Sequence, residues 1–525
     1  MTRKIAAFAG RAGCVDSETE YLSENGWKKI SEYSGEKIAV YNSDGVIHWE
    51  VPENFICEPA TDWYTLKTKY GLDMKLSGEH NVYYITSKGN LYHKTMREIY
   101  ENNILKSKNK NRMVSAKIPT TFKTSATREL PYTDDELRLI VAVQADGTLM
   151  FKDKFRLNLK KKRKQERLEY LLKQCGIKYT YTVAKECNTN AGYISYYFYL
   201  PYGVKVFPSD WYTISERQLK VIADEAPFWD GWVDPRTNSP QYFSNVKSNA
   251  DFIQFAYIVA NGFRTSIHVD DRVGVAHYKT INYAVKCTSV KYVSFHKNYK
   301  DTSPLCTIEQ PKLGEYKYCF TTSTGMWVMR RNNNVYITGN SGKDYRCQQL
   351  EKQGNYKKMA FADALRKIAF TSLGIDFEKG MKQYEWLKAK PSISVEYEDG
   401  DGTSINFRYF LEKLGTEGIR KYDKDFWAKA LIKDIEEVPE ELNICISDLR
   451  FHNEYKYLKE YAEEHGYIFE FIFCDYHSER YQENNTHASA RLAEFLKDVG
   501  YEDGDLIKAE DMQHYIEALE EVNAI

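Results

Sequence analysis

Residues that suit phosphate binding stand at two places far apart in the sequence. Gly10 and Gly13 follow a run of small and branched apolar residues near the start, and Ser341, Gly342 and Lys343 come far downstream. If residues 14–340 are left out, KIAAFAGRAG continues into SGKDYRCQQL, which predicts a strand, a GxxxxGK loop and a helix start. Such a loop binds phosphate through consecutive backbone N–H groups, and its lysine reaches the outer phosphates.

The two ends of this interruption have residues suited to acyl transfer. It begins with Cys14, ends with Asn340 and is followed by Ser341. The Cys14 thiol can attack the Gly13 carbonyl to give a thioester, and the Ser341 hydroxyl can then accept the acyl group. The Asn340 side chain can cyclise onto its own carbonyl and release the interrupting segment. This chemistry needs no cofactor.

The segment after Cys14 alternates short apolar runs with Asn-Gly, Ser-Gly and Asp-Gly turns, which predicts an all-β module of hairpins. With SGEHNVYYI at 77–85 and YKYCFTTSTGMWVMRRNNNVYITGN at 316–340, it resembles an intein, the self-excising module of the Hedgehog/intein fold. The resemblance implies that His80 assists the attack on Gly13. Ser77 replaces the usual threonine of that motif.

The same resemblance implies a supporting acid/base or activating role for Cys319. Two positions depart from the family pattern. Gly339 stands where a histidine usually precedes the terminal asparagine, and Met326 and Trp327 stand where a further histidine is common. Asparagine cyclisation is therefore expected to depend more on backbone geometry. His80 alone could equally be a structural core residue, and Cys319 alone a small buried apolar one.

The middle of the interruption, 126–292, is richer in lysine and in helical patterns, and it resembles a LAGLIDADG homing endonuclease. DDELRLIVAVQADGTL at 134–149 matches the motif and makes Asp146 the acid. A degenerate second copy, EAPFWDGWVD, offers Asp230, with Asp234 as the runner-up. The resemblance implies that the two acids hold Mg²⁺ for cleavage of double-stranded DNA. Basic runs at 106–112 and 160–167 offer phosphate contacts, although charge runs are usually only solvated surface.

After Asn340, apolar strands alternate with helices, which predicts a parallel sheet with its ligand at the strand carboxyl ends. This flank resembles the deoxynucleoside monophosphate kinases of tailed phages, in the P-loop kinase superfamily, through GKD, FADALR, KLGTEGIRKYDKDFW, ISDLRFHNE and THASA. The resemblance implies a deoxynucleoside monophosphate and ATP as substrates. Lys343 and the candidate clamps Arg366, Arg420 and Arg450 would contact phosphates, Asp448 would organise Mg²⁺, and Arg480 would belong to a lid. Asp344 stands where most such loops have Ser or Thr, and each arginine alone could be a surface ion pair.

Composition narrows the class of protein. The 525 residues are 42% hydrophobic, and 73 basic residues nearly balance 74 acidic ones, which indicates several globular domains. Ten cysteines without a CxxC pair give neither a zinc signature nor a disulfide framework, and no apolar run is long enough for a membrane span. We therefore expect a cytoplasmic protein, in an infected bacterium if the gene is of phage origin.

The predicted organisation is a multidomain chain: an α/β P-loop kinase interrupted by an all-β module with an α+β endonuclease insert. The expected boundaries are 1–13 and 341–525 for the kinase, 14–125 and 293–340 for the splicing module, and 126–292 for the endonuclease. Alternatives remain within this interpretation. The kinase acceptor could be another small phosphate compound, the endonuclease could be inactive, the module could cleave without ligation, or the chain could be a nucleotide-binding regulatory protein with an inactive module.

Overall fold

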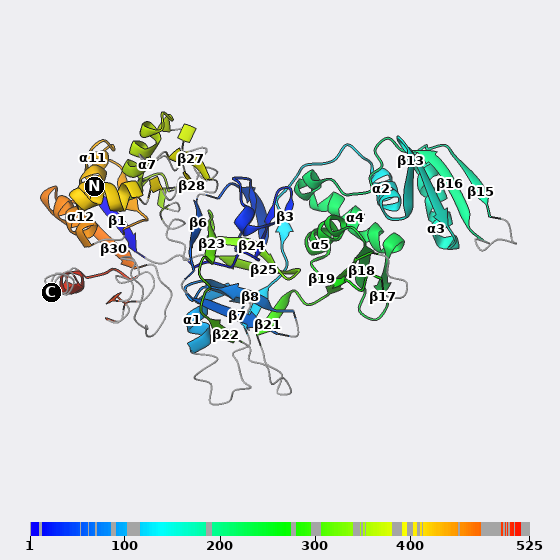
Figure 1. Cartoon of the computed structure of the whole chain (residues 1–525), viewed down its shortest axis with the longest axis horizontal. Coiled ribbons are helices and arrows are strands. Elements are labelled where there is room, and N and C mark those ends of the chain that lie inside the picture. The colour runs from blue at the N-terminus through cyan, green and yellow to red at the C-terminus, as the bar shows by residue number, and fades with distance from the viewer. Residues whose placement is uncertain are drawn as a thin grey trace.

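The structure is a computed structural model of the whole chain, and it describes part of it. The described residues are 2–9, 13–52, 54–60, 62–68, 71–85, 91–101, 116–184, 192–274, 280–295, 306–339, 347, 350–351, 353–377, 379–380, 391–395, 403–406, 410–411, 413–449, 452–473, 495–496, 499, 501, 505–508 and 510–515. In Figure 1 they form three units in a row: the two chain flanks at one end, a β-rich unit in the centre, and an insert of helices and strands at the other end.

The flank unit contains a parallel four-stranded sheet in the order β26-β29-β1-β30. Strand β1 (Lys4–Ala9) lies between β29 (Asn443–Ile446) and β30 (Ile468–Phe473), with Ile5 opposite both Ile444 and Phe469. The edge strand is β26 (Tyr356–Met359). The predicted parallel sheet is therefore confirmed, and it joins residues from both sides of the interruption.

Both faces of this sheet are covered, as the near-continuous apolar strands require. On one face Ile5 and Ala7 pack with α7 (Phe361–Ser372), α11 (Phe426–Glu436) and α12 (His452–Glu464). On the other, Ala6 and Phe8 pack with Cys347. Smaller elements complete the unit: β27 (Pro391–Val395), β28 (Thr403–Asn406), α10 (Arg420–Tyr422) and a π-helical turn (Lys413–Ile419).

The central unit is built from strands drawn from both ends of the interruption, and all of its strand pairs are antiparallel except the pair of β12 with β5. Strand β23 pairs with β6, β22 with β7, β24 with β2, and β25 with β9. Because these pairs are all long-range, neither end of the interruption can complete this unit alone. The strands are β2 (Glu20–Ser23), β3 (Gly26–Lys29), β4 (Ile38–Tyr41), β5 (Val46–Glu50), β6 (Asn54–Pro59), β7 (Trp63–Lys67), β8 (Asp73–Leu76), β9 (Asn81–Ile85), β10 (Leu91–Thr95), β11 (Ala116–Pro119), β12 (Lys123–Thr124), β21 (Tyr292–Phe295), β22 (Cys306–Glu309), β23 (Tyr316–Thr321), β24 (Met326–Arg331) and β25 (Asn334–Gly339). Helical turns lie at η1 (Ile30–Glu32) and α1 (Met96–Glu98).

The insert consists of two helix-and-hairpin halves. In the first, α2 (Asp134–Asp146) leads into β13 (Gly147–Phe151), and β13 pairs with β14 (Lys154–Leu159). In the second, α4 (Glu216–Asp230) leads into β17 (Gly231–Asp234), and β17 pairs with β18 (Ser239–Ser244). The remaining elements are α3 (Lys162–Gln174), β15 (Tyr179–Val183), β16 (Ile194–Tyr199), η3 (Ser209–Thr213), α5 (Lys247–Asn261), β19 (Arg264–Asp270) and β20 (Asn282–Thr288).

The insert is joined to the central unit by more than its two chain connections. Strand β19 pairs with β25 at Ser266 and Asn334. Arg330 of β24 is fully buried, and its guanidinium bonds Glu20 of β2 at 2.7 Å and Asp251 of α5 at 2.6 Å. A buried cation is stable only with such paired carboxylates, so α5 is part of the core that holds β24 in place.

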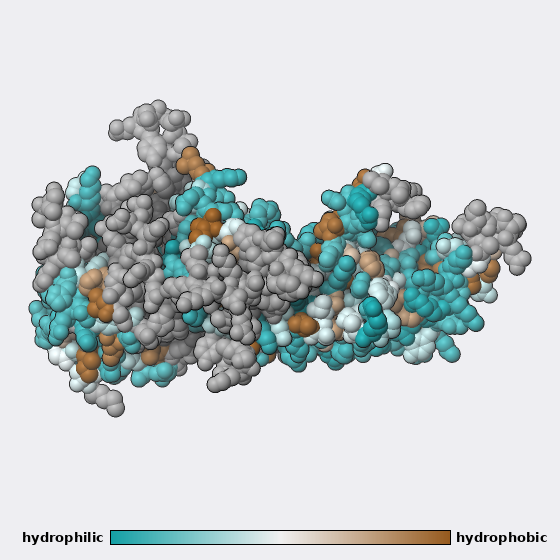
Figure 2. Space-filling model, turned by 90° about the horizontal axis from the view of Figure 1, so that it is seen from below, coloured by the Kyte–Doolittle hydropathy of each residue, from teal (hydrophilic) through white to brown (hydrophobic). Residues whose placement is uncertain are grey.

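Hydrophobic residues on the face seen in Figure 2 form small separate patches in a largely hydrophilic surface. Among the described residues, no helix is both long and apolar enough to cross a membrane.

Candidate functional site

The Gly13–Cys14 peptide lies inside the central unit, against the loop that joins β8 and β9. The backbone N–H of Cys14 donates to Ser77 Oγ at 2.9 Å, and the N–H of Ser77 donates to the Cys14 carbonyl at 2.9 Å. Cys14 and Ser77 are both buried. The next residue, Val15, is bridged to Leu76 on one side and to Tyr318 on the other. This junction is thus held by backbone contacts along its whole length.

Gly13 itself is packed directly against the backbone of the same loop. A Cβ at this position would overlap the Cα of His80 and the carbonyl oxygen of Glu79, and would lie 2.6 Å from the nitrogen of His80. Backbone atoms cannot move aside as a flexible side chain can. Only glycine therefore fits at this position.

His80 is fully buried beside this junction. Its Nε2 makes a short hydrogen bond with Thr338 Oγ1, two residues before Asn340. Burial lowers the pKa of His80 to about 4, and the Gly13 backbone opposes this by favouring the protonated ring. At neutral pH the ring is therefore uncharged, and it lies between the two ends of the interruption.

Cys319 lies in a small buried cluster with Cys14 and Ile56. Val15 and Tyr318 form an antiparallel bridge with reciprocal hydrogen bonds of 2.8 and 2.9 Å, so the adjacent residues Cys14 and Cys319 face each other. The sequence prediction placed a supporting role at Cys319, and the structure brings this thiol beside the Cys14 thiol.

Strand β25 delivers the other end of the interruption to the same loop. Its last residue, Gly339, is opposite Asn81 on β9 and Met326 on β24. A Cβ on Gly339 would overlap the carbonyl oxygen of Gly325 and would lie 2.7 Å from Tyr83 Cε2. A histidine side chain does not fit at this position, and this lack of space explains why the residue before Asn340 is glycine. Asn340 and Ser341 lie outside the described residues.

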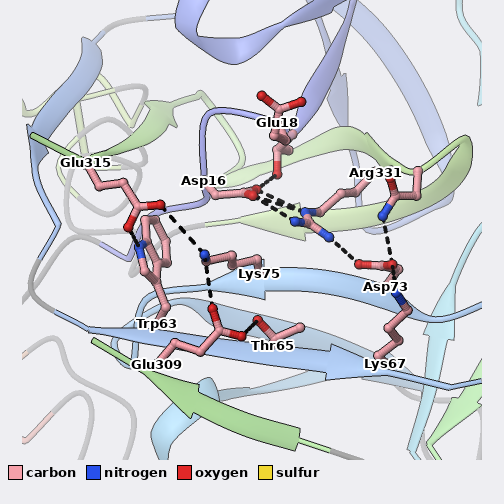
Figure 3. A network of polar contacts seen from close by, with 12 residues as sticks. Asp16, Glu18, Trp63, Thr65, Lys67, Asp73, Lys75, Glu309, Glu315 and Arg331 are labelled. Atoms are coloured by element: carbon pink, nitrogen blue, oxygen red, sulfur yellow. Dashed lines mark hydrogen bonds and ion pairs between the residues drawn. The ribbon is translucent and has the colours of Figure 1, made fainter. Parts of the chain in front are cut away.

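A polar network ties the two ends of the central unit together (Figure 3). Arg331, at the end of β24, bonds Asp16 at 2.9 Å and also pairs with Asp73 of β8. Beside it, Lys75 bonds Glu309 at 3.3 Å. Since Asp16 is two residues from Cys14, the Arg331 pair fixes the hairpin of β24 and β25 relative to the thiol.

The predicted phosphate site is only partly described. Gly10, Gly342, Lys343, Asp344, Arg450 and Arg480 lie outside the described residues. Asp448 follows β29 by two residues, and its carboxylate accepts from the N–H groups of Phe361 and Ala362 at 2.9 and 3.1 Å. This carboxylate thus caps the N-terminus of α7, on the side of the sheet where the carboxyl ends of β1 and β29 lie.

The two candidate clamps that are described both have carboxylate partners. Arg366 bonds Asp363 at 2.6 Å, one turn earlier on α7. Arg420 bonds the buried Glu454 of α12 at 2.9 Å. A role as phosphate clamp would require each guanidinium to share its donors between this carboxylate and a substrate.

The acids of the insert are brought together by the packing of α2 against α4. Glycines end both helices: a Cβ on Gly147 would lie 3.0 Å from Val143 Cα, and one on Gly231 would lie 2.9 Å from Pro227 Cα. Asp146 and Asp230 are the last residues of the two helices, so they emerge at the same end. Asp234, the runner-up, is instead bonded to Arg236 at 3.3 Å.

Asp230 has a perturbed carboxyl group. Burial raises its pKa to about 6, repulsion from Asp146 adds to this, and Lys164 and Lys205 act in the opposite direction. Lys164, from the basic run at 160–167, makes a short ion pair with Asp146. Two carboxylates beside two ammonium groups can together hold a divalent cation and a phosphodiester.

Lys205 was missed by the sequence analysis. Its ammonium donates to the carbonyl oxygens of Val143 and Ala145 at 3.0 and 3.3 Å, at the end of α2. Burial lowers its pKa, while Asp230 and Asp146 favour the charged form. A lysine in a loop with no motif around it gives no sequence signal. Within the described part of the chain, no cluster of three or more His, Cys, Asp or Glu could hold a metal, so these two acids would need substrate or water as further ligands.

Comparisons with known proteins give partial similarities. No protein-family model matches the chain, and no curated protein matches it. Among solved structures, I-DmoI in complex with DNA and Mn is 13% identical, with a TM-score of 0.21 over 30% of this chain and 89% of that one. Full-length DUF199/WhiA from Thermatoga maritima is 14% identical, with a TM-score of 0.22 over 30% of this chain and 53% of that one. The N-terminal LAGLIDADG domain of DUF199/WhiA is 12% identical, with a TM-score of 0.22 over 30% of this chain and 78% of that one. Each match concerns less than a third of the chain.

Proposed function

We propose that this chain is a self-splicing precursor, in which residues 14–340 excise themselves and join Gly13 to Ser341. One observation carries the proposal: β1 lies before Cys14, yet it is an inner strand of a parallel sheet whose other strands all follow Ser341. The flanks are thus one folded unit with an interruption between β1 and its next element. An interruption with reactive residues at both ends is suited to removal.

The buried groups around Cys14 suggest how the first step proceeds. The Cys14 sulfur attacks the Gly13 carbonyl carbon, the Gly13–Cys14 C–N bond breaks, and the nitrogen leaves with a proton to give a thioester and a free amine. His80 is close enough to the Gly13 backbone to handle that proton. Ser77 holds the Cys14 nitrogen in the orientation that the departing amine requires.

The later steps use residues at the far junction. The Ser341 hydroxyl takes the acyl group from sulfur, which frees the thiol and forms an ester. The Asn340 side-chain nitrogen then attacks its own carbonyl, which breaks the Asn340–Ser341 bond and leaves a succinimide. The freed Ser341 amine attacks the ester carbonyl and forms the Gly13–Ser341 peptide bond, regenerating the hydroxyl.

The joined product, 198 residues long, would be an ATP-dependent kinase of deoxynucleoside monophosphates. Its phosphate loop would follow β1 directly, beside the end of β29 and Asp448. The loop amides and Lys343 would bind the ATP phosphates, and Asp448 would help to hold Mg²⁺, which would supply charge neutralisation on the transferred group. Another small phosphate acceptor is the alternative substrate.

Expression of the full chain followed by intact-mass measurement tests splicing directly. We expect a 327-residue excised segment, a 198-residue product, and a tryptic peptide that links Gly13 to Ser341. The Cys14→Ala, Asn340→Ala double variant should remain full length. Persistence of unmodified full-length chain would refute splicing, and two cleaved flanks without the linked peptide would favour a cleavage-only module.

A second function is supported at the insert: metal-dependent cleavage of double-stranded DNA. Asp146 and Asp230 lie together with Lys164 and Lys205 at the helix ends. The outward face of the adjoining sheet has polar, basic and aromatic side chains in register, including Lys154 opposite Tyr199 and Arg156 opposite Tyr197. Such side chains suit contacts to phosphates and base edges. Linearisation of a plasmid with the uninterrupted gene, in the presence of Mg²⁺, tests this function.

A further inference from the structure

The contact between His80 and Thr338 joins parts of the chain that are separated by 258 residues. His80 lies beside the first splice junction, and Thr338 is two residues before the second. Both side chains are fully buried. Neither side chain is in contact with solvent, so each limits the orientation of the other.

The hydrogen bond with Thr338 bears on which ring nitrogen of His80 holds the proton, because a hydroxyl can either donate or accept. The ring is neutral at pH 7, so one nitrogen donates and the other accepts. Nε2 is bound to the Thr338 hydroxyl, whereas Nδ1 is buried, and the Gly13 backbone favours the protonated ring. When the hydroxyl donates to Nε2, the proton is placed on Nδ1, the nitrogen left for the Gly13–Cys14 peptide.

The position of Thr338 is itself closely fixed. It lies on β25 opposite Trp327 of β24, and the following residue, Gly339, is enclosed by Gly325 and Tyr83. Arg331, at the far end of β24, is bonded to Asp16 and Asp73. The hydroxyl is therefore presented to His80 by a hairpin that is anchored at both ends.

We propose that Thr338 is a positioning residue for the first splicing step: its hydroxyl orients the His80 ring and sets its tautomer toward the Gly13–Cys14 peptide. This inference rests on the proposed splicing function. Strand β25 leads into the second splice junction, and this inference gives it a role at the first one.

The test uses the full chain with Asn340→Ala and Ser341→Ala, which stops the reaction at the thioester. Dithiothreitol then releases residues 1–13, and the release rate is followed by mass. We expect Thr338→Val to slow release about tenfold or more, the loss expected for one buried hydrogen bond. Thr338→Ser should restore the rate to within about threefold, since it keeps the hydroxyl. Thr307→Val, at an exposed threonine of β22, is the matched control.

A second measurement separates orientation from general damage. The ¹⁵N shifts of the His80 ring should report a protonated Nδ1 in the parent and in Thr338→Ser, and a changed tautomer in Thr338→Val. If the valine variant does not fold, Thr338→Cys provides the comparison with a much weaker donor. Equal release rates and an unchanged tautomer overturn the inference. Absence of thiol-induced release in the parent instead overturns the proposed splicing function.

Discussion

Ser77 and Cys14 form a reciprocal pair, in which Ser77 Oγ accepts the Cys14 N–H at 2.9 Å and the Ser77 N–H donates to the Cys14 carbonyl at 2.9 Å. The side-chain bond holds the nitrogen that would leave in the proposed first splicing step. We expect Ser77→Ala to leave this buried N–H unsatisfied, at about 1–2 kcal/mol, and to slow thiol-induced release of residues 1–13 about tenfold. Ser195→Ala, at the insert surface, serves as control. An unchanged release rate would mean that the bond has no part in the reaction.

Gly339 predicts a steric limit at the second junction. Gly339→Ala would place its Cβ against the carbonyl oxygen of Gly325, at a cost of about 3 kcal/mol. Hydrogen exchange by mass spectrometry should show faster opening of β24 and β25, together with slower cleavage after Asn340. Gly176→Ala, in open space at φ +66°, should cost only about 1 kcal/mol and leave this hairpin unaffected. Tolerance of Gly339→His with full cleavage would contradict this geometry.

The burial of His80 predicts a pH dependence of stability. Its pKa is about 4 in the folded state and about 6.5 when unfolded, so the unfolded chain binds more protons between these values. This contribution, about 3 kcal/mol, is fully present above pH 6.5 and is lost as the pH falls toward 4. Urea denaturation of the Cys14→Ala, Asn340→Ala precursor, followed by circular dichroism, should show the loss. His80→Gln should remove most of this dependence. An NMR titration midpoint of His80 near 6.5 would contradict the prediction.

The acid pair of the insert predicts which residues DNA cleavage needs. Asp146→Asn or Asp230→Asn should each reduce plasmid linearisation about a hundredfold or more, because a divalent cation would lose one of its two carboxylates. Gel-shift binding should persist, since phosphate contacts dominate affinity. Asp234→Asn should cleave normally, because this carboxylate is paired with Arg236. If only the Asp234 variant lost cleavage, Asp234 and not Asp230 would be the second acid that holds the cation.

The position of the interruption predicts when kinase activity appears. In the Cys14→Ala, Asn340→Ala precursor, the two halves of the phosphate loop remain unjoined. We expect this precursor to have less than about 1% of the activity of the ligated product, because transition-state charge stabilisation requires an intact loop. ATP consumption across the nucleoside monophosphates measures both proteins. If the precursor had normal kinase activity, this activity would not depend on splicing, and the prediction would be wrong.

Local signals in the sequence predicted much of the fold. The apolar runs around Ile5, Ile444 and Ile468 became parallel strands, because residues buried on both faces of a sheet leave near-continuous apolar patterns. The motif DDELRLIVAVQADGTL predicted a helix that ends at Asp146, and the structure has α2 there, with a capping box between Thr133 and Glu136 at its start. Glycine directly after each acid, at 147 and 231, is likewise a local signal, because a residue without a Cβ allows close backbone approach.

Contacts across hundreds of residues could not be predicted in this way. Arg331 reaches Asp16 over 315 residues, and Lys205 reaches the end of α2 from an unremarkable loop. Thr338 resembles any buried strand threonine until β25 is placed beside His80. Such pairs depend on how whole sheets pack, and a single sequence does not specify that packing.

The register of β1 has a mechanical consequence for the proposed splicing reaction. Six residues of β1 are paired with β30, and three of them also with β29. When the Gly13–Cys14 peptide bond is exchanged for a thioester, as proposed, β1 would stay hydrogen-bonded between β29 and β30. The sheet would therefore hold the strand before the first junction in its final position while the Gly13 carbonyl passes from one acceptor to the next.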